Sequence, residues 1–294
     1  MRTNTLAPLV IGLFLLLAPD ARAANEAVLE NVAHRGLTLE AGLPQNTVEA
    51  IAAAYAAGAG TVETDFVLTK TGEIICLHDQ KALATMSTIV KPPAEITPED
   101  RARIDLGEKM RLKRPYRIPL LEDVLKVVPK DRIIQAEIKV YGATYADKFD
   151  AAVKAAGLSE TNVTVSSFSV KALRDFKRHC PKYRTMWLGG GVMNKGFDLE
   201  AIVAQAKEAR ISIVCPGCAS AIRAGFSRAD ADFIRKAGFD FRLYGVNSRE
   251  GLKYAAQVGA SGFTCNYFKG AYQWAKDLGD IRLEPVQHHA KEGE

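Results

Sequence analysis

Two histidines and two closely spaced carboxylates near the start of the chain have side chains suited to acid–base and metal chemistry. They are His34, Glu63, Asp65 and His78. Imidazole titrates near neutral pH, so one histidine can accept a proton from an attacking oxygen while the other donates one to a leaving group. A lone histidine is more often structural, but both are expected at the same edge as the carboxylates. The set is what metal-dependent hydrolysis of a phosphodiester needs.

Glu63 and Asp65 are two residues apart on a predicted strand, so their side chains point the same way. Their charges repel unless a cation lies between them. The apolar flanks 61–62 and 66–68 indicate a buried strand, where carboxylates need a reason to be present. Glu137, near the end of a later strand, adds a third carboxylate. Ligation by oxygen alone favours Mg²⁺ or Ca²⁺ over zinc.

Two cations accompany these carboxylates. Arg35 follows His34 and could bind a phosphate oxygen, or form a structural ion pair with a neighbouring carboxylate. Lys139 lies two residues after Glu137 and faces the same way. Asn46 opens the first helix, and we expect it to be the N-cap.

The elements that must position these residues alternate between strand and helix. We expect strands at 31–34, 61–66, 74–77, 132–138, 163–166, 185–188, 211–215, 241–246 and 261–264. We expect helices at 47–57, 120–127, 145–156, 170–178, 199–209, 228–237 and 249–258. The alternation predicts an α/β fold with a mostly parallel sheet.

One of the predicted strands belongs to a hairpin. The link between 66 and 74 contains the turn signal Lys70-Thr71-Gly72 and is too short for a parallel crossover, so these strands must pair antiparallel. Without this excursion eight strands remain, the number that closes a TIM (β/α)8 barrel. Residues ~80–117 form a small insertion after the second-strand hairpin.

The insertion carries a run of basic residues, namely Arg101, Arg103, Lys109, Arg111, Lys113, Arg114 and Arg117. Such a run is typical of a solvated face, although it could also attract anionic substrates or lipid head groups. Aromatic residues do not interleave it at the spacing that nucleic-acid binding would require. We therefore expect no nucleic-acid partner.

Residues 1–23 are predicted to be an export signal, with an apolar stretch at 9–17 and the cleavage pattern Ala21-Arg22-Ala23. The apolar stretch is shorter than the ~20 residues that span a bilayer, which favours a cleaved signal over an uncleaved membrane anchor. After cleavage we expect no stable membrane span. The mature domain would be 24–294, exported and either periplasmic or secreted.

Five cysteines follow the signal, and in an exported protein they can pair, with an odd one left over. Cys215-Pro-Gly-Cys218 has redox or metal spacing, but a zinc site would need a second such pair. We therefore favour the interpretation that the cysteines are small buried residues or form one local disulfide.

The ordered motifs resemble the glycerophosphodiester phosphodiesterase family. They are His34-Arg35-Gly36, Pro44-Gln45-Asn46-Thr47, Glu63-x-Asp65, Thr69-Lys70-x-Gly72, His78-Asp79, Ile118–Leu125, Glu137-Ile138-Lys139 and Ser167-Phe168. The resemblance implies a TIM barrel with a small insertion, a divalent metal, and hydrolysis of a small-molecule glycerophosphodiester to sn-glycerol 3-phosphate and an alcohol. Carried over by position, the catalytic acid/base pair is His34 and His78, the metal ligands are Glu63, Asp65 and Glu137, and the phosphate is bound by Arg35 and Lys139.

Four segments depart from the family pattern. Gln45 replaces a glutamate, and Tyr244-Gly245-Val246-Asn247 replaces W-T-V-N while keeping an aromatic, Tyr244, on the substrate side. Residues 265–268 and 81–85 also differ, the former reading Cys-Asn-Tyr-Phe where T-D-Y-P is usual. The catalytic set is intact, and the differences fall where substrate is chosen.

Several alternatives remain open from the sequence. The nucleophile is either water or the glycerol 2-hydroxyl. A related phospholipase D-like enzyme, acting on lysophospholipids or sphingomyelin, would share the same histidines and carboxylates. A non-catalytic binding barrel predicts loss of a catalytic residue, and none is lost.

Overall fold

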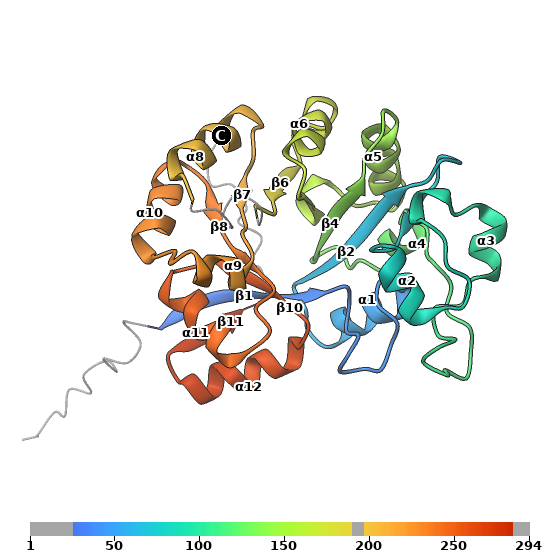
Figure 1. The fold of residues 1–294 in the computed structure, drawn as a ribbon, viewed down its shortest axis with the longest axis horizontal. Coiled ribbons are helices and arrows are strands. Elements are labelled where there is room, and N and C mark those ends of the chain that lie inside the picture. Colours follow the sequence, from blue (N-terminus) through green and yellow to red (C-terminus); the bar gives the residue numbers. More distant parts are fainter. Residues whose placement is uncertain (1–25, 190–196, 285–294) are drawn as a thin grey trace, which may run out of the picture.

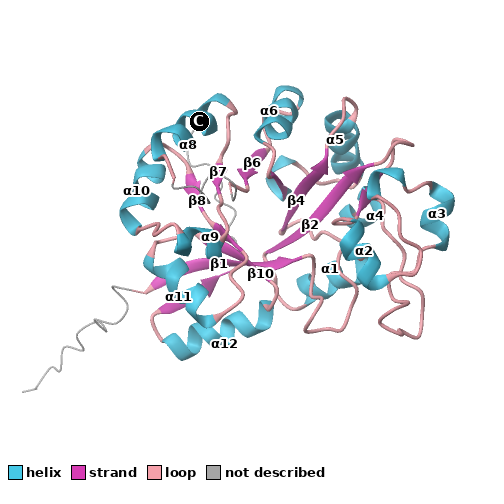
Figure 2. Cartoon of the chain, in the orientation of Figure 1, coloured by secondary structure: helices cyan, strands magenta, loops and turns pink. Residues whose placement is uncertain are grey.

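The strands form one sheet that curves into a nearly closed barrel (Figures 1 and 2). The computed structural model describes residues 26–189 and 197–284, so the predicted export signal lies outside the described residues. The strands are β1 (Ala27–His34), β2 (Thr61–Leu68), β3 (Ile74–Cys76), β4 (Ile133–Val140), β5 (Val163–Ser167), β6 (Arg184–Trp187), β7 (Ile213–Val214), β8 (Asp240–Phe241), β9 (Leu243–Tyr244), β10 (Gly262–Cys265) and β11 (Ile281–Glu284).

The strand order confirms the predicted TIM-barrel fold. Neighbouring strands run β8-β7-β6-β5-β4-β2-β1-β10-β9, and every pair along this path is parallel. The short strands β8 and β9 lie in one five-residue segment, of which Asp240 pairs with β7 and Tyr244 pairs with β10. That segment joins the two ends of the sheet. β3 pairs antiparallel with β2, as the turn signal between them predicts.

Helices follow most strands and cover the outside of the barrel (Figure 2). They are α1 (Val48–Ala56), α2 (Gln80–Met86), α3 (Pro98–Arg103), α4 (Leu121–Leu125), α5 (Tyr145–Ala155), α6 (Val170–His179), α8 (Leu199–Glu208), α9 (Cys218–Arg223), α10 (Arg228–Lys236), α11 (Arg249–Gln257) and α12 (Phe268–Leu278), with 3₁₀ turns η2 (Pro93–Glu95) and η3 (Glu160–Asn162). Side-chain N-caps such as Thr47, Ser169 and Ser248 fix where helices begin.

The main hydrophobic core lies between the helices and the outward faces of the strands. Val62, Ile134 and Val165 from successive strands are buried in it, and Phe149 and Phe176 pack edge-to-face at 5.7 Å between ring centroids. Burial of these side chains stabilises the barrel by roughly 1.5–3 kcal/mol each. The barrel is therefore a rigid frame for side chains at its strand ends.

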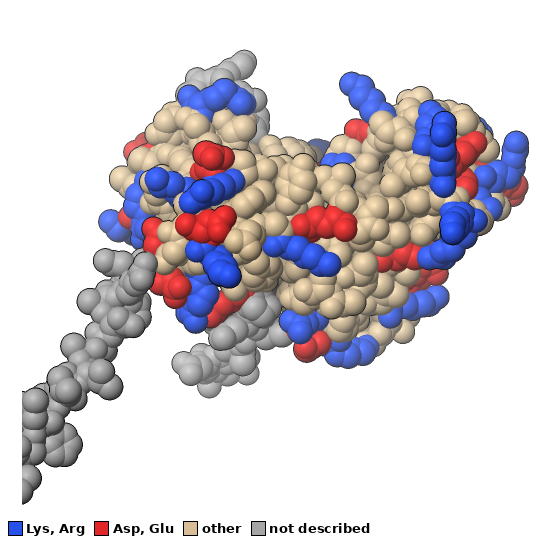
Figure 3. Space-filling model, turned by 90° about the horizontal axis from the view of Figure 1, so that it is seen from below, with Lys and Arg blue, Asp and Glu red and all other residues tan. Residues whose placement is uncertain are grey.

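The insertion packs on the hairpin rather than forming part of the barrel wall. A second buried cluster joins Ile75 and Leu77 of the hairpin side to Leu83, Ile104 and Tyr116 of the insertion. The basic side chains of the insertion are mostly exposed. In Figure 3, Lys and Arg side chains are visible on the right-hand side, where Figure 1 places α2 and α3, and also on the left-hand side.

The sheet differs from the prediction at two places. A single strand was expected at 241–246, but Arg242 interrupts it and pairs with Glu30 at 2.5 Å and Asp240 at 3.1 Å. Burying the guanidinium between two carboxylates satisfies its charge. The strand β11 was not predicted, and its pairing with Ala27–Glu30 explains why β1 begins earlier than expected.

The five cysteines are all free and buried, which agrees with the interpretation as small buried residues and not with a local disulfide. Burial raises the pKa of the Cys215 and Cys218 thiols, which keeps both protonated. Among the described helices, none has the length and apolarity needed to cross a bilayer.

Candidate active site

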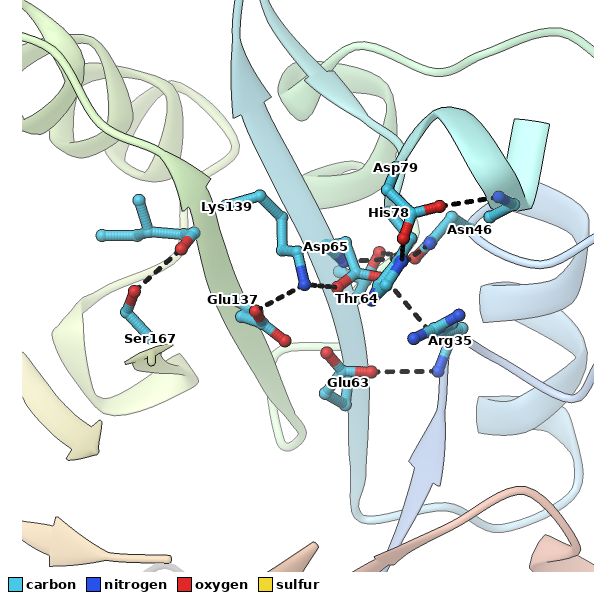
Figure 4. A network of polar contacts seen from close by, with 12 residues as sticks. Arg35, Asn46, Glu63, Thr64, Asp65, His78, Asp79, Glu137, Lys139 and Ser167 are labelled. Carbon is cyan, nitrogen blue, oxygen red and sulfur yellow. Dashed lines mark hydrogen bonds and ion pairs between the residues drawn. The ribbon is translucent and has the colours of Figure 1, made fainter. Parts of the chain in front are cut away.

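Three buried carboxylates meet at the C-terminal ends of β2 and β4 (Figure 4). Asp65 lies beside Glu137 in the strand register, and Glu63 lies beside His34 of β1. One oxygen from each of Glu63, Asp65 and Glu137 lies within 4.8 Å of the others. The parallel register therefore brings together ligands that are far apart in the sequence.

Asn46 holds Asp65 in place. Its Nδ2 donates to Oδ2 of Asp65 at 2.8 Å, while its Oδ1 accepts from the hydroxyl of Thr64 at 2.8 Å and from the backbone N–H of Asp65 at 3.1 Å. The predicted N-cap role of Asn46 is wrong, because Thr47 caps α1. Asn46 has φ of 60°, and this left-handed conformation turns its amide toward β2.

Arg35 contacts two of the carboxylates. Its backbone N–H donates to Oε2 of Glu63 at 3.2 Å, and its Nε lies 3.2 Å from Oδ2 of Asp65. Its Nη1 donates to Oε1 of Gln45 at 2.5 Å, so an amide oxygen serves where the family pattern has a carboxylate. The next residue, Gly36, has φ of 87°, and a Cβ there would lie 2.5 Å from the backbone of Ala50.

Lys139 lies between Glu137 and Asp65, as Figure 4 shows, at 2.8 Å and 3.7 Å from their carboxylate oxygens. Its Nζ also lies over the ring of Phe168, 5.7 Å from the centroid. Phe168 in turn packs edge-to-face on Tyr244 at 5.4 Å. The predicted substrate residue Tyr244 therefore belongs to an aromatic wall beside the carboxylates, and half-exposed Phe168 forms its open part.

His34 places its two ring nitrogens against different groups. Nε2 lies 3.7 Å from Oε2 of Glu63, and Nδ1 is hydrogen-bonded to Oδ1 of Asn266, which follows β10. Burial, with Arg35 beside it, lowers the pKa of His34 to about 4. The ring is therefore neutral in this environment.

His78 follows the hairpin and is oriented by its neighbour. Its Nδ1 lies 2.8 Å from Oδ2 of Asp79, whose other oxygen accepts from the backbone N–H of Ala82 at 2.6 Å and caps α2. Burial, together with the nearby charges of Arg35 and Lys139, lowers the pKa of His78, while Asp65 and Asp79 oppose this shift. The insertion therefore begins with a helix whose cap also fixes His78.

The charges of the site fit a bound divalent cation. Burial raises the pKa of Glu63 well above its usual range, and burial with Asp65 nearby raises the pKa of Glu137 to about 7, although Lys139 opposes this shift. Oδ1 of Asp65 is buried with no hydrogen-bond partner among the described residues. Crowded carboxylates with an unsatisfied oxygen are the donor set that Mg²⁺ or Ca²⁺ takes.

The structure brings together the predicted site residues His34, Arg35, Glu63, Asp65, His78, Glu137 and Lys139, with Tyr244 reached through Phe168.

The sequence analysis missed two residues that contribute to the site. Asn46 was assigned to the helix, and Asn266 was noted only as a departure from the family pattern. The signal that could have found Asn266 is its position directly after the last barrel strand, where site residues gather.

The fold and the site define a TIM-barrel protein with an acidic metal-type centre at the C-terminal ends of its strands. A model of the glycerophosphoryl diester phosphodiesterase family matches residues 34–269. The chain belongs to this family, whose members are phosphoric diester hydrolases.

Individual relatives agree with this assignment. A glycerophosphodiester phosphodiesterase of Caldanaerobacter subterraneus subsp. tengcongensis is 33% identical over 51% of this chain; the match spans 62% of that relative, less than two thirds of its length. A phosphodiesterase of Oleispira antarctica, solved with the product sn-glycerol-3-phosphate, is 16% identical with a TM-score of 0.70, covering 87% of this chain and 99% of that one. A glycerophosphodiester phosphodiesterase of Parabacteroides distasonis is 18% identical with a TM-score of 0.69, covering 86% and 99%. The two structures support the barrel fold.

Proposed function

We propose that this protein hydrolyses glycerophosphodiesters to sn-glycerol 3-phosphate and an alcohol, with a divalent metal. The observation that carries the proposal is the buried cluster of Glu63, Asp65 and Glu137, with one oxygen of each within 4.8 Å of the others, in a member of this family. The product bound to the Oleispira antarctica relative supports the choice of substrate.

The three carboxylates would hold the metal, which supplies positive charge to polarise the phosphate and offset its developing negative charge. Arg35 and Lys139 add two cations at the same place, each anchored to a carboxylate at 3.2 Å and 2.8 Å. Anchored cations need little reorganisation when substrate arrives, so they favour an anion at the centre of the site.

The contacts of the two histidines suggest different roles for them. His34 is hydrogen-bonded to the uncharged amide of Asn266, which favours a protonated ring less than a carboxylate would, and burial lowers the pKa of His34, so the neutral ring is suited to accept the proton of the nucleophile. His78 is backed at 2.8 Å by the carboxylate of Asp79, which stabilises a protonated imidazole that can donate to the leaving alcohol.

The test is hydrolysis by purified protein that has been stripped with chelator and reloaded separately with Mg²⁺, Ca²⁺ and Mn²⁺. We expect sn-glycerol 3-phosphate from glycerophosphocholine or glycerophosphoethanolamine in at least one metal, and none in excess chelator. Equal activity in chelator would contradict the metal assignment. No turnover of any phosphodiester in any metal would contradict the function and favour a binding barrel.

Nothing in the relatives described above favours the phospholipase D-like alternative. Lysophosphatidylcholine, assayed on the same preparation, separates the two activities. Release of choline from this lipid, with no hydrolysis of glycerophosphocholine, would contradict the proposal.

We also propose that the chain is exported to the periplasm or secreted, because residues 1–23 have the pattern of a cleaved signal. Expression of the full chain followed by N-terminal sequencing tests this. The expected mature product begins at Ala24 and is found outside the cytoplasm. An uncleaved cytoplasmic product would contradict it.

A further inference from the structure

Among the described residues, Asn266 is the one whose side chain is hydrogen-bonded to the ring of His34. Its Oδ1 contacts Nδ1 of His34 across a sequence separation of 232 residues. The opposite nitrogen, Nε2, faces Glu63 at 3.7 Å. One nitrogen of the ring therefore faces an uncharged amide and the other faces the carboxylate cluster.

Contacts on both sides fix the backbone at Asn266. Its own N–H donates to Oδ1 of Asn247 at 2.8 Å. Just after it, the first N–H groups of α12 at Lys269 and Gly270 donate to the carboxylate of Glu40, at 2.9 Å and 2.8 Å. Glu40 lies in the loop that leads from His34 to α1. The loops after β1, β9 and β10 are thus joined beside His34, and the backbone that carries the Asn266 amide is anchored on both sides.

The chemistry of the amide oxygen determines where the His34 proton lies. A carbonyl oxygen only accepts, so the nitrogen that faces it must be the one that carries hydrogen. In a neutral imidazole the other nitrogen then has the lone pair. An aspartate, which the family pattern has at this position, would also accept from Nδ1 but would add a negative charge beside the ring.

We propose that Asn266 is a positioning residue that keeps the His34 proton on Nδ1, so that Nε2 presents its lone pair to the nucleophile. This inference rests on the proposed function. The hydroxyl proton of the nucleophile passes to Nε2 as its oxygen bonds to phosphorus. The bond from phosphorus to the alcohol oxygen breaks, and that oxygen takes a proton from His78. Nδ1 stays bonded to Asn266 throughout, so the ring does not rotate.

Three variants of the full metal-loaded enzyme test the role through kinetics. Asn266→Ala removes the acceptor, and we expect kcat to fall about 10- to 100-fold with KM little changed, the usual size of such an indirect effect. Asn266→Asp keeps an acceptor oxygen and should retain most of kcat. Lys269→Ala is the matched control, because Lys269 is an exposed side chain three residues further on. An Asn266→Ala enzyme with the kcat of the wild type would overturn the proposal.

A second measurement does not depend on activity. Nitrogen-15 NMR of the Mg²⁺- or Ca²⁺-loaded enzyme without substrate, with the His34 signals assigned from His34→Ala, reports which ring nitrogen is protonated. We expect Nδ1–H in the wild type and in Asn266→Asp, and loss of this preference in Asn266→Ala. An Nε2–H ring in the wild type would refute the inference even if Asn266→Ala does not fold. Absence of hydrolysis by the wild type would instead contradict the proposed function, while the NMR result still tests Asn266.

Discussion

Replacing Asn46 with alanine should both destabilise the fold and loosen the metal-type centre, because one buried side chain serves both. The amide makes three hydrogen bonds at 2.8–3.1 Å, two of them to Asp65 and one to Thr64. Asn46 is 0% exposed, so water cannot replace the lost partners. The substitution removes one partner from a carboxylate oxygen and one from a hydroxyl, each of which keeps another contact, and it removes the side-chain partner of a backbone N–H.

The expected loss follows from these groups and from the backbone. Leaving a buried polar group unsatisfied costs roughly 1–3 kcal/mol. The cost lies at the low end of this range for two of the groups. The Thr64 hydroxyl retains Sγ of Cys76 at 2.7 Å, and Oδ2 of Asp65 retains Nε of Arg35 at 3.2 Å. Holding alanine at a φ of 60° adds about 1–2 kcal/mol. The total is about 4–7 kcal/mol, a large part of the roughly 5–15 kcal/mol that stabilises a typical domain.

Urea unfolding followed by circular dichroism measures this loss, with two matched variants. Asn46→Gly removes the same hydrogen bonds but tolerates the left-handed backbone, so the difference between the two variants isolates the backbone cost. Thr47→Ala removes only the cap of α1 and should cost about 1 kcal/mol. If Asn46→Gly were as stable as the wild type, the hydrogen bonds to Asp65 and Thr64 would not carry the energy assigned to them.

Three further outcomes are expected. Glu63→Gln should abolish metal-dependent hydrolysis and weaken Ca²⁺ or Mg²⁺ binding in calorimetry while leaving the circular dichroism spectrum intact; full activity would remove Glu63 from the metal site. Burial alone would raise the pKa of Asp240, but the charge of Arg242 and hydrogen bonds from Ser261 and Arg242 hold it below its usual value. The ionised Asp240 therefore stabilises the folded protein fully above about pH 4, and this stabilisation is lost as the pH falls further. Melting temperatures across this range should therefore fall less steeply for Asp240→Asn than for the wild type, and parallel curves would refute the linkage. Because all five cysteines are free and buried, the melting temperature should not depend on reductant, and an Ellman assay of the native protein should detect few thiols; a reductant-sensitive transition would indicate a disulfide.

Local pattern was enough to predict most of the barrel, because each strand is a short apolar run bounded by turn residues. The local pattern gave wrong strand boundaries where contacts between distant residues determine the structure. In the sequence, Arg242 lies within a predicted strand. In the structure, it forms ion pairs with Glu30 and Asp240, and the strand is divided in two at this residue. The strand Ile281–Glu284 alternates apolar and charged residues, and its proximity to a charged tail hid this signal.

The alternation of side chains along a strand was enough to predict only part of the site. Glu63 and Asp65 share a face because they are two residues apart, and Glu137 joins them through the register of β2 with β4. Asn46 and Asn266 could not be placed in this way. Asn46 depends on a left-handed backbone that its sequence neighbours do not reveal, and Asn266 reaches His34 only when the barrel closes.

The position of β1 has a consequence for the order in which the protein can fold. β1 is the earliest strand in the sequence, yet two of its three partners, β10 and β11, are the latest. Pairing such distant segments closes a loop of more than two hundred residues. The chain loses conformational entropy when this loop closes, and the contacts between the strands compensate for that loss only once they have formed. During synthesis the β1 edge therefore stays unpaired until nearly the whole chain exists. His34 acquires its Asn266 partner at that last step, so a chain truncated before β10 would lack the hydrogen bond to His34 even if its remaining strands had paired.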